Sequence, residues 1–150
     1  MLSAAVARSL PYSAEQLFDL AADIERYPQF LRWWTAATIR ERSGQYCRVE
    51  NTVALGPMRL QFTSAATLLR PERIDVRSTE APFRRFDLGW RFEPQPEGSC
   101  CVRLTVTLQL RSFILQQLIE QYVQGFMGEI LLAFEARARA LYVGQRATNR

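Results

Sequence analysis

The stretch "CVRLTVTLQLRSFILQQLIEQYVQGFMGEI", residues 101–130, contains the change of pattern that decides the fold. Before Ser112, every second residue is apolar, which is typical of a strand with one buried face. After Ser112, a residue type that caps helix N-termini, large apolar residues recur every four positions: Tyr122, Phe126, Ile130 and Phe134. We therefore expect a long helix over about 113–143, roughly 45 Å in length.

The chain before this stretch is predicted to consist mostly of strands. Residues 35–110 read as about six strands of an antiparallel sheet, and residues 2–10 as another strand. Between them, Ser13 and Gln16 have the spacing of a capping box, which marks a helix start. This order indicates an α+β fold in which the long helix lies across a curved antiparallel sheet. With no linker or repeat, residues 1–150 are expected to form one domain.

The segment "ERYPQFLRWW", residues 25–34, is predicted to contain a second short helix. Pro28 is well placed as its first residue, because proline is favoured at that position. In a helix over 28–34, Phe30, Trp33 and Trp34 lie on one face. We expect these three residues to form the lip of a cavity, where tryptophan also suits a membrane interface.

Composition excludes several kinds of chemistry. The chain has 19 arginines, no lysine and no histidine, and a formal net charge of +4. Without histidine, the usual general base and the commonest metal ligand are missing. Three cysteines, Cys47, Cys100 and Cys101, do not make a zinc site or a disulfide framework, so we expect free thiols and no metal. The positive charge suits anionic partners such as lipid headgroups or RNA, or is a solvated surface.

A sheet that wraps a long helix encloses space that side chains or a ligand must fill. The candidate lining residues are Phe30, Trp33, Trp34, Phe62, Phe83, Phe86, Trp90, Tyr122, Phe126 and Ile130, and a well-filled core is the alternative. Arg26, Arg32, Arg84 and Arg85 are candidates for membrane or anionic contact around the mouth, and Arg137, Arg139, Arg146 and Arg150 form a basic C-terminal end. Gly125 and Gly128 lie inside the predicted helix, where they allow close packing or a kink, or else give a ligand room or let the helix bend as a lid. No catalytic set is recognisable.

Three blocks resemble the coenzyme Q-binding, START-like family, which includes the bacterial ribosome-association toxin and belongs with the polyketide cyclase/dehydrase group. They are "VARSLPYSAEQLFDLAADIERYPQFLRWW", "EAPFRRFDLGWRF" and "LLAFEARARALY". The positions that match the family motifs are Tyr27, Pro28, Phe30, Leu31, Pro82, Phe83, Gly89, Trp90 and Phe92. Arg32, Trp34 and Ala81 depart from the family pattern.

The resemblance implies a helix-grip (START/Bet v 1-like) fold with a cavity between the long helix and the sheet. It implies a non-enzymatic carrier or chaperone of ubiquinone or a related isoprenoid lipid that supports respiration, with no other cofactor. Two alternatives stay open: a protein that binds the large ribosomal subunit, and a polyketide cyclase/dehydratase-like enzyme. We see no signal peptide or 18-residue apolar run, and expect a cytoplasmic bacterial protein, with peripheral contact to the inner membrane left open and DNA not among its partners.

Overall fold

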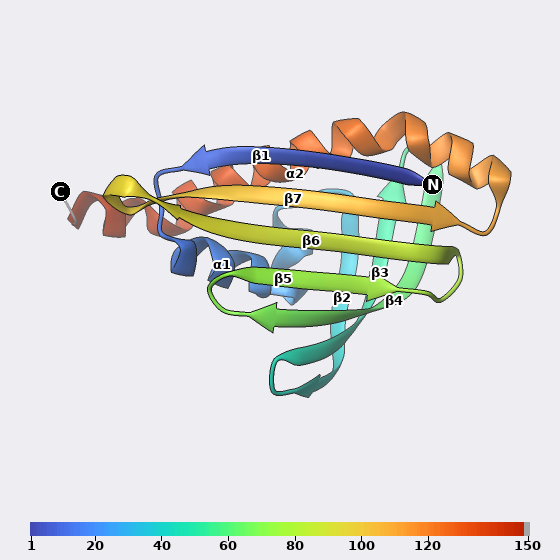
Figure 1. Ribbon diagram of the computed structural model, residues 1–150, viewed down its shortest axis with the longest axis horizontal. Coiled ribbons are helices and arrows are strands. Elements are labelled where there is room, and N and C mark those ends of the chain that lie inside the picture. The colour runs from blue at the N-terminus through green and yellow to red at the C-terminus, as the bar shows by residue number, and fades with distance from the viewer. Residues whose placement is uncertain (149–150) are drawn as a thin grey trace.

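The computed structural model describes the backbone of residues 1–148 and the side chains of all of these except residues 55 and 143–148. Seven strands, two α-helices and two short 3-10 helices alternate along the chain (Figure 1). In order they are β1 (Leu2–Leu10), α1 (Ala14–Ala22), η1 (Ile24–Gln29), β2 (Trp34–Ser43), β3 (Tyr46–Leu55), β4 (Met58–Leu69), β5 (Arg73–Ser78), β6 (Phe83–Gln95), η2 (Pro96–Gly98), β7 (Ser99–Leu110) and α2 (Phe113–Thr148).

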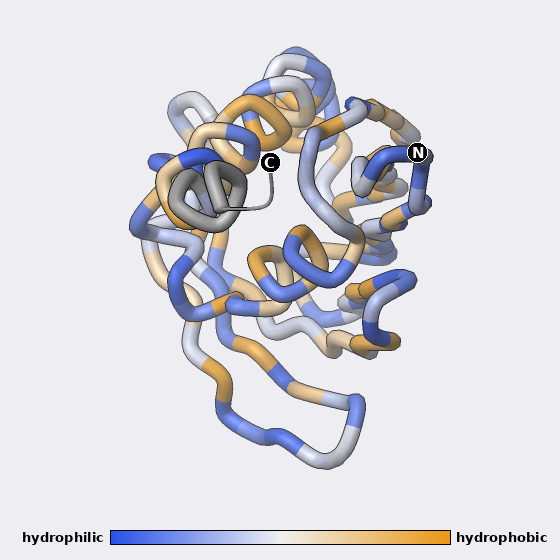
Figure 2. The backbone as a smooth tube through the Cα atoms, turned by 90° about the vertical axis from the view of Figure 1, so that its left-hand side faces the viewer, coloured by the Kyte–Doolittle hydropathy of each residue, from blue (hydrophilic) through white to orange (hydrophobic). Residues whose placement is uncertain are grey.

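The seven strands form one antiparallel sheet in the order β1-β7-β6-β5-β4-β3-β2. Helix α2 runs across this sheet and packs most closely on β1 and β7, at one end of the strand order (Figure 1). Helix α1 packs on β5, β6 and β7. In the view of Figure 2, α2, α1 and the sheet surround a common interior, and the β2–β3 hairpin projects beyond it.

Local sequence signals account for both helix starts. The Ser13 side chain accepts a hydrogen bond from the Gln16 backbone N–H at 3.1 Å, and the Gln16 side chain accepts one from the Ser13 N–H at 3.0 Å. These bonds satisfy backbone donors that the first turn of a helix leaves free. Ser112 caps α2 in the same way, accepting from the Leu115 N–H at 3.2 Å. The predicted capping box, the six strands after the first helices and the start of the long helix are confirmed.

The predicted helix over 28–34 is wrong. The 3-10 helix η1 ends at Gln29, and β2 begins at Trp34. The backbone here pairs with β3, because the Ala54 N–H donates to the Trp33 carbonyl at 2.8 Å and Trp34 lies opposite Val53. Trp33 lies in the turn before β2, and Trp34 is the first residue of that strand. The two tryptophans therefore do not share one helix face.

Candidate ligand-binding cavity

An apolar cavity of about 70 Å³ lies between α2 and the inner face of the sheet. Its walls carry only apolar and aromatic side chains, contributed by β2, β3, β4, β6, β7 and α2 and the residue before β2. They include Trp33, Trp34, Phe62, Phe83, Phe86, Phe126 and Ile130, together with Val123 and Met127 of α2. We call this space the inner cavity.

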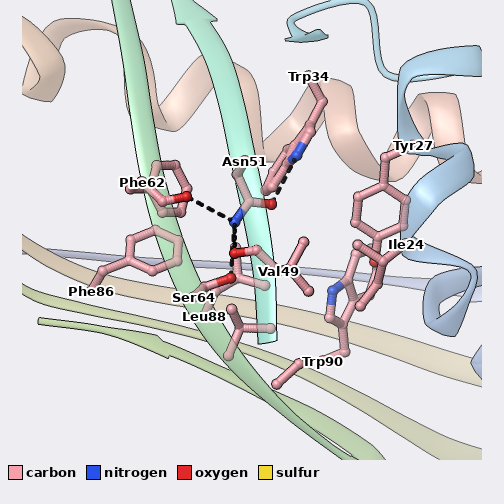
Figure 3. Close-up of a pocket in the computed structure, with 12 residues that line it drawn as sticks. Ile24, Tyr27, Trp34, Val49, Asn51, Phe62, Ser64, Phe86, Leu88 and Trp90 are labelled. Carbon is pink, nitrogen blue, oxygen red and sulfur yellow. Dashed lines mark hydrogen bonds between the residues drawn. The ribbon is translucent and has the colours of Figure 1, made fainter. Parts of the chain in front are cut away.

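A smaller space of about 20 Å³ adjoins the inner cavity. The two spaces share part of their walls, because both are lined by Trp34, Phe62, Phe86 and Leu88. The smaller space, called here the side chamber, also has two polar residues in its wall, Asn51 and Ser64 (Figure 3). It extends toward Tyr27 and Trp90. Polar groups that fix a ligand's orientation in an otherwise apolar pocket are typical of small-molecule sites.

On the outside, a cleft of about 520 Å³ opens between α2 and the start of the β3–β4 turn. Its lining is more polar and includes Arg32, Gly56, Gln121, Tyr122 and Glu129. Trp33 and Phe126 line both this outer cleft and the inner cavity. Their ring centroids lie 5.3 Å apart. These two rings therefore form the partition between the outer cleft and the inner cavity.

Nine of the ten predicted lining residues border one of these spaces. Seven line the inner cavity, Trp90 lines the side chamber, and Tyr122 lines only the outer cleft. Ligand binding by any of them stays a prediction. The alternative of a well-filled core holds for part of the set: Trp90, for example, is only 3 % exposed and packs on Phe134, with ring centroids 5.0 Å apart.

Phe30 is the exception, because it lines none of the three spaces. Its ring packs edge-on against Tyr27, with centroids 5.9 Å apart, and the Arg137 guanidinium lies 5.6 Å from the ring centre. The expected lip of Phe30, Trp33 and Trp34 is therefore not formed. Trp33 is 8 % exposed and acts as an internal wall, so its ring does not reach a membrane in this conformation.

The candidate arginines do not gather at one mouth. Of the four, only Arg32 borders the outer cleft, where it lies 3.6 Å from Glu129. Arg26 pairs with Asp23 at 2.9 Å and Arg85 with Asp87 at 2.5 Å, whereas exposed Arg84 has no ion-pair partner in the described part of the chain. At the C-terminal end, Arg137 donates to Gln29 and Arg139 pairs with Glu135. Arg146 and Arg150 lie outside the residues whose side chains are described.

Close packing does not explain the two glycines of α2. A Cβ atom built on Gly125 or Gly128 meets no atom within 4 Å, so alanine fits at either position. Gly125 borders the outer cleft. Gly56 differs, because its φ is +59° and an added Cβ comes within 2.6 Å of the Tyr122 ring. This glycine is needed both for the turn and for the close approach of Tyr122.

Asn51 and Ser64 are the residues that the sequence analysis missed as site candidates. Asn51 lies on the buried face of β3, between the buried Val49 and Val53 positions. Ser64 lies opposite Val49 on β4, between the buried Phe62 and Ala66 positions. A polar residue at a position that the strand alternation assigns to the core is the signal, because burying it requires a hydrogen-bond partner.

Burial raises the pKa of one hydroxyl group and two thiol groups in the core. Burial raises the pKa of the Tyr27 phenol, which donates a hydrogen bond to the Ala21 carbonyl. Burial also raises the pKa of the Cys47 thiol, and raises that of Cys100 to about 11. In residues 1–148, no three cysteine, aspartate or glutamate side chains gather as a metal site would require. None of the described helices is both long and apolar enough to cross a membrane.

The family model for polyketide cyclase/dehydrase and lipid transport matches residues 10–135. The chain belongs to this family. The seven-stranded sheet with α2 across it is the helix-grip fold of START and Bet v 1-like proteins, as the resemblance implied. The Zhui aromatase/cyclase of Streptomyces sp. R1128 has the same fold, with a TM-score of 0.84 over 93 % of this chain and 95 % of that one, at 17 % identity.

Curated proteins that are similar to this chain carry different functional names. The ribosome association toxin RatA of Pseudomonas aeruginosa is 32 % identical over 133 residues, covering 89 % of this chain and 92 % of the toxin. The mitochondrial coenzyme Q-binding protein COQ10 homolog B of Xenopus laevis is 22 % identical over 137 residues, covering 89 % of this chain and 56 % of that protein.

Proposed function

We propose that this protein is a non-enzymatic carrier or chaperone that binds ubiquinone or a similar isoprenoid lipid between α2 and the sheet and supports respiratory electron transport. The observation that supports this proposal is the inner cavity, whose walls are entirely apolar and aromatic. Burying apolar ligand surface there contributes roughly 25 cal/mol per Å². The likeness to a coenzyme Q-binding protein points to the same ligand class.

The size of the cavity adds a requirement. At about 70 Å³, the inner cavity is smaller than the roughly 150 Å³ that holds a benzene molecule in an engineered protein core. A quinone ring therefore enters only if α2 moves away from β2, β3 and β4. Such a movement is compatible with the packing of α2, which is closest on β1 and β7 at the other end of the sheet. It separates Trp33 from Phe126 and joins the inner cavity to the outer cleft.

The test is mass spectrometry of an organic extract of the protein, purified natively from a ubiquinone-producing bacterium. We expect near-stoichiometric isoprenoid quinone in the wild type. Val123→Phe, which fills the inner cavity from α2, should remove it. Leu132→Phe is the matched control on the same helix, because Leu132 is 57 % exposed. Equal lipid content in both variants, or no lipid in the folded wild type, would contradict the proposal.

Association with the large ribosomal subunit is the second candidate, and the observation that favours it is the 32 % identity to a ribosome association toxin. The surface gives weaker support, because many arginines lie within 4 Å of a carboxylate, which reduces the positive potential available to phosphates. Arg84 is exposed and has no such partner among residues 1–148, so it is the first to replace.

Sedimentation with purified large subunits tests this candidate. Binding through arginine–phosphate contacts should fall steeply between 50 and 200 mM salt and should weaken in Arg84→Ala. Arg26→Ala is the control, since Arg26 is already paired with Asp23. If the wild type does not sediment with large subunits at low salt, the second candidate fails.

A further inference from the structure

Three side chains form a hydrogen-bonded chain beside the side chamber: the partly buried Trp34 and the buried Asn51 and Ser64 (Figure 3). Asn51 and Ser64 are each 4 % exposed. The rest of the side chamber wall is almost wholly apolar or aromatic. Polar groups in such surroundings carry a large desolvation cost unless they are bonded, so the direction of each bond can be worked out.

The direction begins at Trp34, whose indole N–H can only donate. It lies 3.3 Å from Oδ1 of Asn51, which must accept. The amide nitrogen of Asn51 then faces the carbonyl oxygens of Val49 and Phe62, at 3.3 and 3.4 Å, and Oγ of Ser64 at 2.9 Å. If the Asn51 amide were turned over, its N–H groups would face the indole N–H of Trp34, and its oxygen would face the carbonyl oxygens of Val49 and Phe62. The surroundings therefore allow one orientation of the amide.

Ser64 is the end of the chain. Since the Asn51 amide nitrogen has no acceptor capacity, Oγ of Ser64 accepts that bond and keeps its own proton to donate. Within the described residues, the bond from Asn51 is the one hydrogen bond that Oγ of Ser64 makes, so its proton is not donated to another group there. Ser64 borders the side chamber, so the hydroxyl proton is available to a group placed there. Each bond in the series polarises the next, which makes the last O–H a better donor than an isolated serine.

From this series we infer that the Ser64 hydroxyl is a ligand-recognition donor, and that the side chamber is a subsite for one acceptor oxygen of an otherwise apolar ligand. The volume of the side chamber, about 20 Å³, fits a single oxygen atom, because it is close to the volume that holds one water molecule. A ketone or quinone oxygen accepts from Ser64, whereas a hydrocarbon leaves the proton unbonded. The ring or chain that carries the oxygen then occupies the inner cavity. The inference rests on the proposed function and specifies its ligand class.

The experiment uses acetophenone and ethylbenzene, which have the same carbon framework and differ at the carbonyl oxygen. Dissociation constants come from NMR titrations that follow the backbone amides and the Trp34 indole N–H. Ser64→Ala should weaken acetophenone binding about 3- to 10-fold, the range for one hydrogen bond, and leave ethylbenzene binding unchanged. Ser64→Thr, which keeps the hydroxyl, should restore the acetophenone affinity. Trp34→Phe should lower it, because the Asn51 amide is then free to turn.

Ser78→Ala is the matched control. Ser78 is 5 % exposed, but its hydroxyl donates to the Thr63 carbonyl at 2.6 Å and does not border the side chamber. It should leave both dissociation constants unchanged. The inference would be overturned if Ser64→Ala weakened the binding of both probes equally or of neither probe. It would also be overturned if the wild type bound neither probe. A parallel titration with decylubiquinone separates the two claims: if it fails while acetophenone depends on Ser64, the quinone carrier is rejected and the donor subsite stands.

Discussion

Replacing both glycines of α2 by alanine should make the protein more stable. Glycine in a helix interior costs about 1 kcal/mol relative to alanine, because the unfolded glycine has more conformational freedom to lose. Gly125 and Gly128 lie well inside the Phe113–Thr148 helix, and an added Cβ at either position meets nothing within 4 Å. No steric term therefore offsets the gain.

The expected gain for Gly125→Ala with Gly128→Ala is about 2 kcal/mol in the free energy of unfolding. For a chain of 150 residues, about 1 kcal/mol raises the melting temperature by roughly 2–4 °C, so the double variant should melt roughly 4–8 °C higher. Urea and thermal unfolding followed by far-ultraviolet circular dichroism measure both quantities.

Gly44→Ala is the control that isolates the backbone. An added Cβ at Gly44 also meets nothing within 4 Å, but its φ is +57°, in the left-handed region. The same substitution in equally open space should therefore cost about 1–2 kcal/mol. An unchanged or lower stability of the helix double variant, with the expected loss in Gly44→Ala, would refute the claim that the two helix glycines are unconstrained by packing.

Three further changes test other parts of the structure. Trp33→Ala should lower the free energy of unfolding in urea by about 3–5 kcal/mol, because the ring is buried against Phe126 and is not exposed at a lip. A decrease of less than about 1 kcal/mol would show that the Trp33 ring is not part of the core. Tyr27→Phe should cost about 1–3 kcal/mol, since it leaves the buried Ala21 carbonyl without its donor; an unchanged urea midpoint would show that this bond contributes nothing. Stability should fall between pH 9 and 11, because the Cys100 thiol ionises near its ordinary value of 9.0 in the unfolded chain but at a pKa of about 11 in the folded protein. Below pH 9 both states keep the proton and this contribution is fully present; Cys100→Ala should flatten the decline in urea midpoints measured at pH 8 and 10.5, and an equally steep decline in that variant would exclude Cys100 as its source.

The fold could be predicted because its signals are local. The change from a period of two to a helical period at Ser112, and the capping box at Ser13, each depend on a few neighbouring residues. The segment 28–34 was predicted wrongly because its pattern also fits a helix. What decides its structure is the pairing of Trp34 with Val53, a contact between residues far apart in the sequence, and tertiary contacts override propensity in short segments.

The sequence predicted many of the residues that line the site but not how they are arranged. Aromatic residues at core positions were identified, yet the sequence does not show that Phe30 packs under Arg137 or that Trp33 and Phe126 meet. The same limit applies to charges: the Arg32–Glu129 pair joins the loop before β2 to α2. Asn51 could have been found, because an amide on a strand face whose other residues are apolar requires a buried partner.

The three tryptophans of the chain all border the internal spaces: Trp33 and Trp34 the inner cavity, and Trp34 and Trp90 the side chamber. The tryptophan fluorescence of the protein therefore originates entirely from the walls of the proposed site. A quinone that accepts excitation energy would quench all three indoles at contact distance, whereas a particle bound only to the outer surface would leave most of the emission unchanged. The unlabelled protein thus carries its own optical reporter, and a single emission spectrum distinguishes occupancy of the interior from docking on the exterior.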